Sequence, residues 1–211
     1  MIEVFVFSVS PALFLLWYFY HKDKIEPEPK LYVIATFAFG ATVSPLLSSI
    51  FSFPFTPLPF AAVFIAPVFE EVFKLLAIYI PFRRRQIDGV MDGVVYGVAA
   101  GLGFATTENI IYGLSFGENV VLLRAIFTPV AHATFTAVSG VGVGLIAEGK
   151  TNNVLPFLIT AITLHSIWNF FALIYFPFNI VLLVLNILLL RKLVEIGLRE
   201  DMEKIRYYLS R

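Results

Sequence analysis

The 211-residue sequence contains no cysteine and few charged residues. Without cysteine, the chain can form neither a disulfide nor a thiolate metal site. Charged residues make up 14% of the chain, whereas about 25% is typical of soluble domains, and 59% of the residues are hydrophobic. This composition indicates a protein whose main partner is the lipid bilayer, and we expect no nucleic-acid partner.

Seven apolar segments are candidates for transmembrane helices. We therefore expect an all-α polytopic membrane protein with about seven transmembrane helices. The first segment carries Glu3 in place of a basic start and no small-residue cleavage site follows it, so we expect a retained helix, not a cleaved signal peptide. The seven segments cover approximately residues 2–20, 31–52, 57–82, 90–115, 119–147, 154–171 and 177–193.

Basic residues are missing from alternate connectors. The connectors 51–58, 115–120 and 171–178 contain no Lys or Arg, whereas 13 of the 15 basic residues lie in the other connectors or at the C-terminal end. Because Lys and Arg are retained on the cytoplasmic side of membranes, the pattern predicts a multi-pass cell-membrane protein. Its N-terminus would be extracytoplasmic and its C-terminus cytoplasmic.

The sequence indicates one transmembrane domain, residues 1–193, followed by a cytoplasmic tail, residues 194–211. No soluble domain, linker or low-complexity tract interrupts it. The sequence of the tail predicts an amphipathic helix at the membrane surface, and a helix that binds a partner protein is the alternative. Its apolar residues recur at helical spacing, namely Val194, Leu198, Met202, Ile205 and Leu209.

Small residues dominate the start of segment 90–115. Gly89, Gly93, Gly97 and Gly101 recur every four residues and form overlapping GxxxG units, which allow a neighbouring helix to approach closely. We interpret these glycines as helix-packing residues. Asp88 and Asp92 flank the start of this segment, where carboxylates cap a helix and favour its dipole.

Segment 57–82 contains only three charged residues, which lie within five positions: Glu70, Glu71 and Lys74. Each charge at a bilayer centre costs about 2.5–3.5 kcal/mol. Other segments also carry embedded polar groups, and ionisable residues in such positions mark functional sites by default. We therefore expect four helices to converge on a polar cluster, within a functional core of about residues 57–171. The further embedded polar residues are Glu108, Asn109, Arg124, His132, His165 and Asn169.

Helix geometry restricts the pairings in this cluster. Lys74 can reach either Glu70 or Glu71, while the two glutamates point about 100° apart. We expect one glutamate to face a cavity and the other to be held by Lys74 or a neighbouring helix. Helical rise puts Glu108 and His165 about 10 Å from the extracytoplasmic ends of their segments. These depths predict access from outside the cell or laterally from the bilayer.

Three kinds of chemistry suit such a cluster. A carboxylate could activate water for peptide hydrolysis, with His and Asn holding the oxyanion. Glu108, His132, His165 and one of the paired glutamates could instead bind a divalent metal such as zinc. The groups could also form a proton or cation relay in a transporter, although no internal repeat supports one.

Several protease motifs are absent. The sequence contains no HExxH, which excludes a zincin-like helix, and no GxGD with an embedded aspartate pair. Ala137-Val138-Ser139-Gly140 lacks the first Gly of a GxSG motif. Ser139 and His165 also fall in opposite halves of their segments, too far apart for a nucleophile and its base.

The ordered set of embedded residues nevertheless resembles a known family. Glu70-Glu71-x-x-Lys74, then Phe104-x-x-x-Glu108-Asn109, then His165-x-x-x-Asn169 lie on successive segments. This order is similar to that of the PrsW family of intramembrane proteases, which is related to the CAAX prenyl proteases and bacteriocin-processing enzymes. Asp92-Gly93-x-x-Tyr96-Gly97 agrees with it. The resemblance covers residues 66–170.

The resemblance implies a glutamic-type endopeptidase that cleaves membrane-anchored proteins, including first-site cleavage of anti-sigma-factor-like substrates on the extracytoplasmic side. It implies that Glu70 activates water and that His165 and Asn169 stabilise the oxyanion, without a cofactor; zinc is the alternative. Glu108 replaces a His of the CAAX enzymes, which leaves its role open. The candidate catalytic residues are Glu70, Glu71, Glu108, His165 and Asn169, and the supporting residues are Lys74, Asn109, Arg124 and His132.

Overall fold

The computed structural model describes residues 1–210, and of Tyr208 the backbone alone. Over residues 1–210 the protein consists of helices and loops without a strand, which confirms the all-α fold. In chain order the elements are α1 (Ile2–Tyr20), α2 (Lys30–Ser52), the 3-10 helix η1 (Phe53–Phe55), α3 (Ala61–Phe64), α4 (Ala66–Arg83), α5 (Val90–Phe116), α6 (Glu118–Ala147), α7 (Leu155–Ile174) and α8 (Phe178–Leu209).

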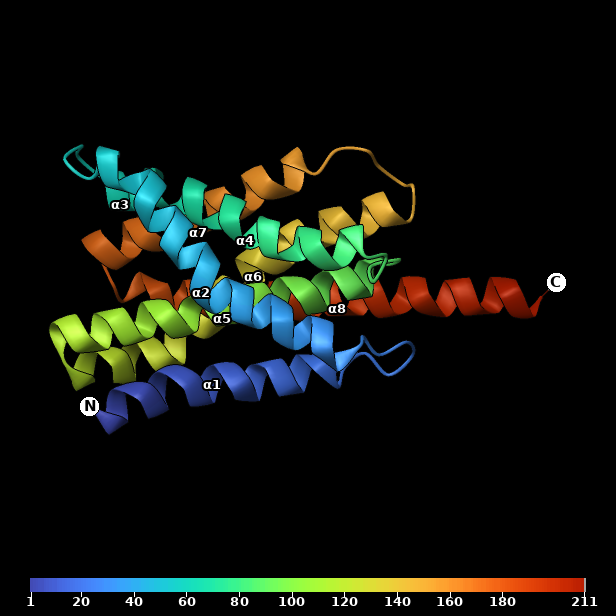
Figure 1. Ribbon diagram of the computed structural model, residues 1–211, viewed down its shortest axis with the longest axis horizontal. Helices are drawn as coiled ribbons and strands as arrows, with labels where there is room; N and C mark the ends of the chain where they lie inside the picture. Colours follow the sequence, from blue (N-terminus) through green and yellow to red (C-terminus); the bar gives the residue numbers. More distant parts are fainter. Residues whose placement is uncertain (211) are drawn as a thin grey trace.

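The long helices run back and forth between two ends of a bundle (Figure 1). The connectors 21–29, 84–89 and 148–154 lie at one end, from which the C-terminal part of α8 projects. These connectors contain Lys and Arg, whereas the connectors at the opposite end contain none. We call the first the basic end. The alternation of basic residues in the sequence thus coincides with the two ends of the bundle.

Five described helical segments are long and apolar enough to cross a membrane: α1, α2 with η1, α5, α6 and α7. The other two long helices carry more charge. Helix α4 has 18 residues and contains Glu70, Glu71, Lys74 and Arg83, while charged residues begin at Arg191 in α8. Both helices still pack within the bundle, α4 against α2, α5, α6 and α7, and α8 against α5, α6 and α7.

Two segment boundaries differ from the expected ones. Segment 57–82 is divided, because α3 ends at Phe64 and α4 starts at Ala66 with Pro67 in its first turn. Proline lacks the N–H that would continue a helix from the preceding turn, and it favours a helix start. Of the expected tail 194–211, residues 194–209 are helical as expected, and residue 211 lies outside the described residues. No break separates these residues from the last transmembrane segment, since α8 runs to Leu209.

Helix α5 is the centre of the bundle. Every residue from Val90 to Thr106 is buried, and α5 packs most extensively against α6. The glycine spacing explains this contact: a Cβ on Gly93 would lie 2.1 Å from the carbonyl oxygen of Gly140, and one on Gly101 would lie 2.3 Å from that of His132. The helix-packing interpretation of the glycines is therefore confirmed.

The N-terminus of α5 is capped by the side chain of Asp92, which lies in its first turn. The Asp92 Oδ2 atom accepts hydrogen bonds from the backbone N–H groups of Asp88 at 2.7 Å and Gly89 at 2.9 Å. These N–H groups have no partner in the first turn of the helix, so the carboxylate satisfies them. The expected capping role of Asp92 is confirmed.

Candidate active site

The embedded ionisable residues meet in one network, built by four helices. Helix α4 contributes Glu70, Glu71 and Lys74, α5 contributes Glu108, α6 contributes Arg124 and His132, and α7 contributes His165. These residues lie far apart in the sequence, and close packing of α5 and α6 around glycine brings their helices together. The sequence-based prediction of four converging helices therefore agrees with the structure.

Glu71 is fully engaged by its neighbours. Its Oε1 atom accepts a hydrogen bond from Lys74 Nζ at 2.7 Å and lies 2.9 Å from His165 Nδ1. Its Oε2 atom accepts a hydrogen bond from Thr136 Oγ1 at 3.2 Å. The side chain is 0% exposed. Glu71 is thus the glutamate held by Lys74 and neighbouring helices, one of the two situations that the sequence predicted for the pair.

Glu70 is in a different environment. Its side chain is 13% exposed, and its Oε2 atom is buried without a hydrogen-bond partner. This oxygen lies 3.7 Å from His165 Nε2 and 3.8 Å from Lys74 Nζ, which are ion-pair distances but too long for good hydrogen bonds. Glu70 therefore has an oxygen that can accept a proton, whereas both oxygens of Glu71 are occupied.

A chain of charged groups connects α4 to α5 and α6. The Lys74 ammonium lies 2.9 Å from His132 Nδ1 and can only donate, so His132 carries its proton on Nε2. This Nε2 atom lies 2.9 Å from Glu108 Oε2, and Arg124 Nη2 donates to the same oxygen at 2.6 Å. Aromatic rings support both cations, Phe104 at 4.1 Å from Lys74 and Tyr112 at 3.9 Å from Arg124. The cluster thus neutralises most of its own charge.

The two asparagines hold different parts of the site. The Asn109 Oδ1 atom accepts hydrogen bonds from Arg124 Nε at 3.0 Å and Thr128 Oγ1 at 2.7 Å. Asn169 lies on α7 and donates from Nδ2 to the carbonyl oxygen of Ala62 in α3 at 3.0 Å. Asn109 therefore orients Arg124, whereas Asn169 binds the short helix next to the site.

Two threonines that were not predicted from the sequence also hydrogen-bond to the network, Thr128 and Thr136. Both are buried on α6. With Arg124 and His132 they occur every four residues, which places all four on one face of a helix. This spacing was the signal that could have found them.

A cavity of 380 Å³ adjoins the network. Glu108, Arg124, His132 and Asn169 contribute to its wall. The remaining lining residues belong to the half of the bundle opposite the basic end and include Ala62, Tyr112, Val120, Leu173 and Phe176.

Comparison with known proteins identifies the family. A family model described as PrsW family intramembrane metalloprotease matches residues 28–192. The chain belongs to the PrsW family. Protease PrsW of Oceanobacillus iheyensis is 32% identical over 209 residues, covering 91% of this chain and 96% of that protein. Protease PrsW of Shouchella clausii is 30% identical, with coverages of 91% and 97%, and that of Clostridioides difficile is 26% identical, with coverages of 99% and 92%. No solved structure matches the chain.

Membership in this family confirms the resemblance drawn from the embedded motifs, and it makes the protein a membrane-embedded peptidase. The family description names a metalloprotease, so the fit of a metal to the site matters. Glu70, His132 and His165 offer donor atoms that all lie within 4.8 Å of one another. One carboxylate and two imidazoles form a donor set typical of catalytic zinc, and Glu70 keeps its Oε2 atom without a hydrogen-bond partner. The residues fit a divalent metal.

Proposed function

We propose that this protein is a glutamic-type endopeptidase that hydrolyses peptide bonds of membrane-anchored proteins with water activated by Glu70. The observation that carries the proposal is the difference between the paired glutamates. Both oxygens of Glu71 have hydrogen-bond partners, whereas the Oε2 atom of Glu70 has none and faces His165. A general base needs an oxygen that can reach the water and accept its proton.

In this mechanism Glu70 takes a proton from water while the water oxygen attacks the carbonyl carbon of the substrate. The developing oxyanion is stabilised by donors from His165 and Asn169. Glu70 then returns the proton to the leaving amine nitrogen as the C–N bond breaks. Glu71 is a positioning residue: its contact at 2.9 Å holds a proton on His165 Nδ1 and turns Nε2 towards Glu70. In this mechanism His165 acts as an imidazolium, protonated on both nitrogens, so that Nε2 can donate to the oxyanion.

Asn169 carries two N–H groups on Nδ2. One of them donates to the carbonyl oxygen of Ala62 in α3. We assign the second N–H group to the oxyanion. Glu108 already accepts from Arg124 and His132, so we assign it to holding these two groups at the cavity wall.

The position of the cavity supports access from the extracytoplasmic side. The cavity lies in the half of the bundle opposite the basic end, and basic connectors remain in the cytoplasm. We therefore propose an extracytoplasmic N-terminus, a cytoplasmic C-terminus, and first-site cleavage of an anti-sigma-factor-like protein as the function. In this arrangement residues 1–193 form the protease domain, with its core at about 57–171, and residues 194–211 form the cytoplasmic tail.

The test is cleavage of a single-span reporter protein by purified enzyme in liposomes. We expect Glu70→Gln to abolish cleavage, because the amide cannot accept the proton, while the variant still inserts and folds. The matched control is Glu118→Gln, which makes the same chemical change at an exposed position outside the site. Full activity of Glu70→Gln, or ion-driven flux without cleavage of any peptide, would overturn the proposal.

Metal-dependent proteolysis is a second candidate, favoured by the proximity of Glu70, His132 and His165. A divalent metal held by these residues would supply Lewis-acid polarisation and a water of lowered pKa. In the structure both nitrogens of His132 are engaged, by Lys74 and Glu108, so His132 would have to release one of them. Stoichiometric zinc, with activity lost to a chelator and restored by zinc, would establish this candidate in place of the metal-free mechanism.

A further inference from the structure

A second cluster of carboxylates lies at the basic end, away from the peptidase site. Asp23 and Glu28 belong to the connector between α1 and α2, and Asp92 to the first turn of α5. The three residues are 3%, 5% and 6% exposed. One oxygen from each lies within 4.8 Å of the others. Asp92 and Glu108 are 16 residues apart on α5, which separates the cluster from the peptidase site by about 24 Å.

The hydrogen bonds of the cluster leave one carboxylate oxygen without a partner, although Glu28 and Asp92 also hydrogen-bond to each other. Glu28 Oε2 accepts from the Tyr96 hydroxyl at 2.6 Å, and Asp92 uses Oδ2 for the helix cap. Asp23 Oδ1 accepts from the backbone N–H of Glu26 at 3.3 Å. The Asp23 Oδ2 atom is buried and has no hydrogen-bond partner. An almost fully buried carboxylate therefore enters the cluster with a free oxygen.

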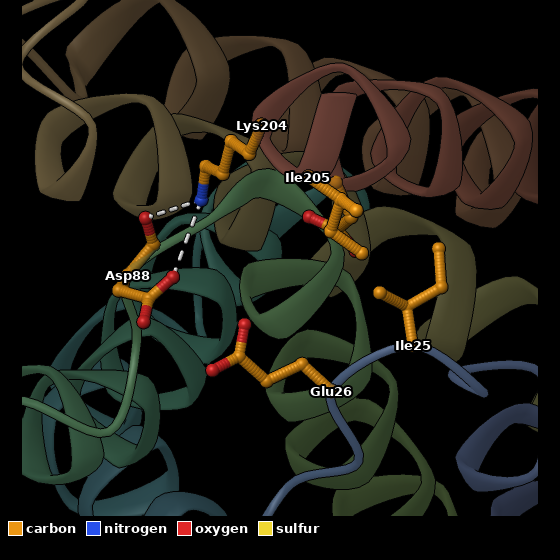
Figure 2. Close-up of a pocket in the computed structure, with 6 residues that line it drawn as sticks. Ile25, Glu26, Asp88, Lys204 and Ile205 are labelled. Carbon is orange, nitrogen blue, oxygen red and sulfur yellow. Dashed lines mark hydrogen bonds and ion pairs between the residues drawn. The ribbon is translucent and has the colours of Figure 1, made fainter. Parts of the chain in front are cut away.

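Over residues 1–210, no Lys or Arg forms an ion pair with Asp23, Glu28 or Asp92, so no cationic side chain in this range is paired with the cluster. Lys204 lies nearby but is taken by Asp88, through the carbonyl oxygen at 2.9 Å and Oδ1 at 3.2 Å, as Figure 2 shows. Burying an unpaired charge costs several kcal/mol, and like charges in one site add to it.

We propose that Asp23, Glu28 and Asp92 bind a hard divalent cation, of the Mg²⁺ or Mn²⁺ type, that ties the α1–α2 connector to the start of α5. The donors are all oxygens, without His or Cys, which favours these ions over zinc. Glu28 and Asp92 also line a cavity of 240 Å³ at the basic end, beside the 520 Å³ cavity of Figure 2. These cavities provide an approach for the ion and room for the water ligands that Mg²⁺ retains.

The test is equilibrium dialysis of the purified, chelator-treated protein against MnCl₂, with MgCl₂ as competitor. We expect one Mn²⁺ per chain that Mg²⁺ displaces, and affinity lowered roughly tenfold or more in Asp23→Asn and Glu28→Gln. Glu118→Gln is the matched control, because this exposed glutamate lies outside the cluster and lines neither cavity. Glu70→Gln should also retain the ion, which distinguishes this site from a metal in the peptidase site.

A second readout is thermal unfolding, because an ion that binds only the folded state stabilises it. Mg²⁺ should raise the unfolding midpoint of the wild type and of Glu118→Gln, and leave that of Asp23→Asn unchanged. The proposal is overturned if the wild-type protein binds no Mn²⁺ at millimolar concentration. It is also overturned if the binding survives in folded Asp23→Asn and Glu28→Gln, or disappears in Glu70→Gln.

Discussion

The buried pair of Glu71 and Lys74 allows a quantitative prediction. Replacement of Lys74 by methionine keeps a long apolar side chain but removes the ammonium that donates to Glu71 at 2.7 Å and contacts His132 at 2.9 Å. Both side chains of the pair are 0% exposed. Glu71 would then be a buried carboxylate with only His165 and Thr136 as partners.

The magnitude follows from the burial. Removing one partner of a buried ion pair costs about 3–5 kcal/mol, because the other charge is left uncompensated. Loss of the cation–π contact with Phe104 adds roughly 1 kcal/mol. Adding Glu71→Gln to Lys74→Met removes the carboxylate charge that the first substitution leaves without its ammonium partner. We therefore expect Lys74→Met with Glu71→Gln to cost at least about 2 kcal/mol less than the sum of the single variants.

The assay is reversible unfolding in mixed detergent micelles, with the four proteins of the double-mutant cycle compared. Lys192 and Glu195 provide the control cycle, since they form an ion pair at 3.2 Å with the same three-residue separation, but each side chain is 56% exposed. Exposed pairs of this kind contribute about 0–1 kcal/mol. The reasoning fails if the coupling energy of Glu71 and Lys74 is no larger than that of the exposed pair.

Three further outcomes follow from the structure. A cysteine introduced as Arg84→Cys should be labelled by an impermeant reagent only from the cytoplasmic side; labelling of intact cells from outside would contradict the topology. Gly140→Ala should destabilise the protein by about 1–3 kcal/mol, because the added Cβ would lie 1.9 Å from the Gly93 carbonyl oxygen, and an unchanged unfolding midpoint would contradict the observed approach of α5 and α6. His165→Ala should abolish reporter cleavage in a folded protein, and retained cleavage would exclude the role proposed for this imidazole.

Much of the fold was predictable because it depends on local composition. Apolar length determines where helices form, and the Gly93 and Gly97 spacing identified the face of α5 that contacts α6. The break at Ile65 was not predicted, although Pro67 favours a helix start there, because the apolar pattern continues across it. The continuity of α8 was missed because charged residues after Arg191 end the apolar pattern without ending the helix.

Some residues of the candidate site could be predicted from the sequence and others could not. Embedded charges are costly, so the sequence alone could select the charged residues of the network. Thr128 and Thr136 were missed because a threonine in a transmembrane segment carries little cost and can bond to its own helix, as Thr128 does to Arg124. Their importance depends on which side chains they face, and that depends on the packing of α6.

By itself, the sequence determined that the chain is a membrane-embedded helical protein with its polar residues gathered in four segments, because hydrophobicity and the cost of buried charge act on each segment separately. Only the tertiary structure decided that Glu71 is engaged and that Glu70 keeps an oxygen free. The spacing of residues within α4 does not distinguish Glu70 from Glu71, since both can reach Lys74. Their difference comes from Thr136 and His165, which are 65 and 94 residues away from Glu71 in the chain and reach it only when α6 and α7 pack against α4.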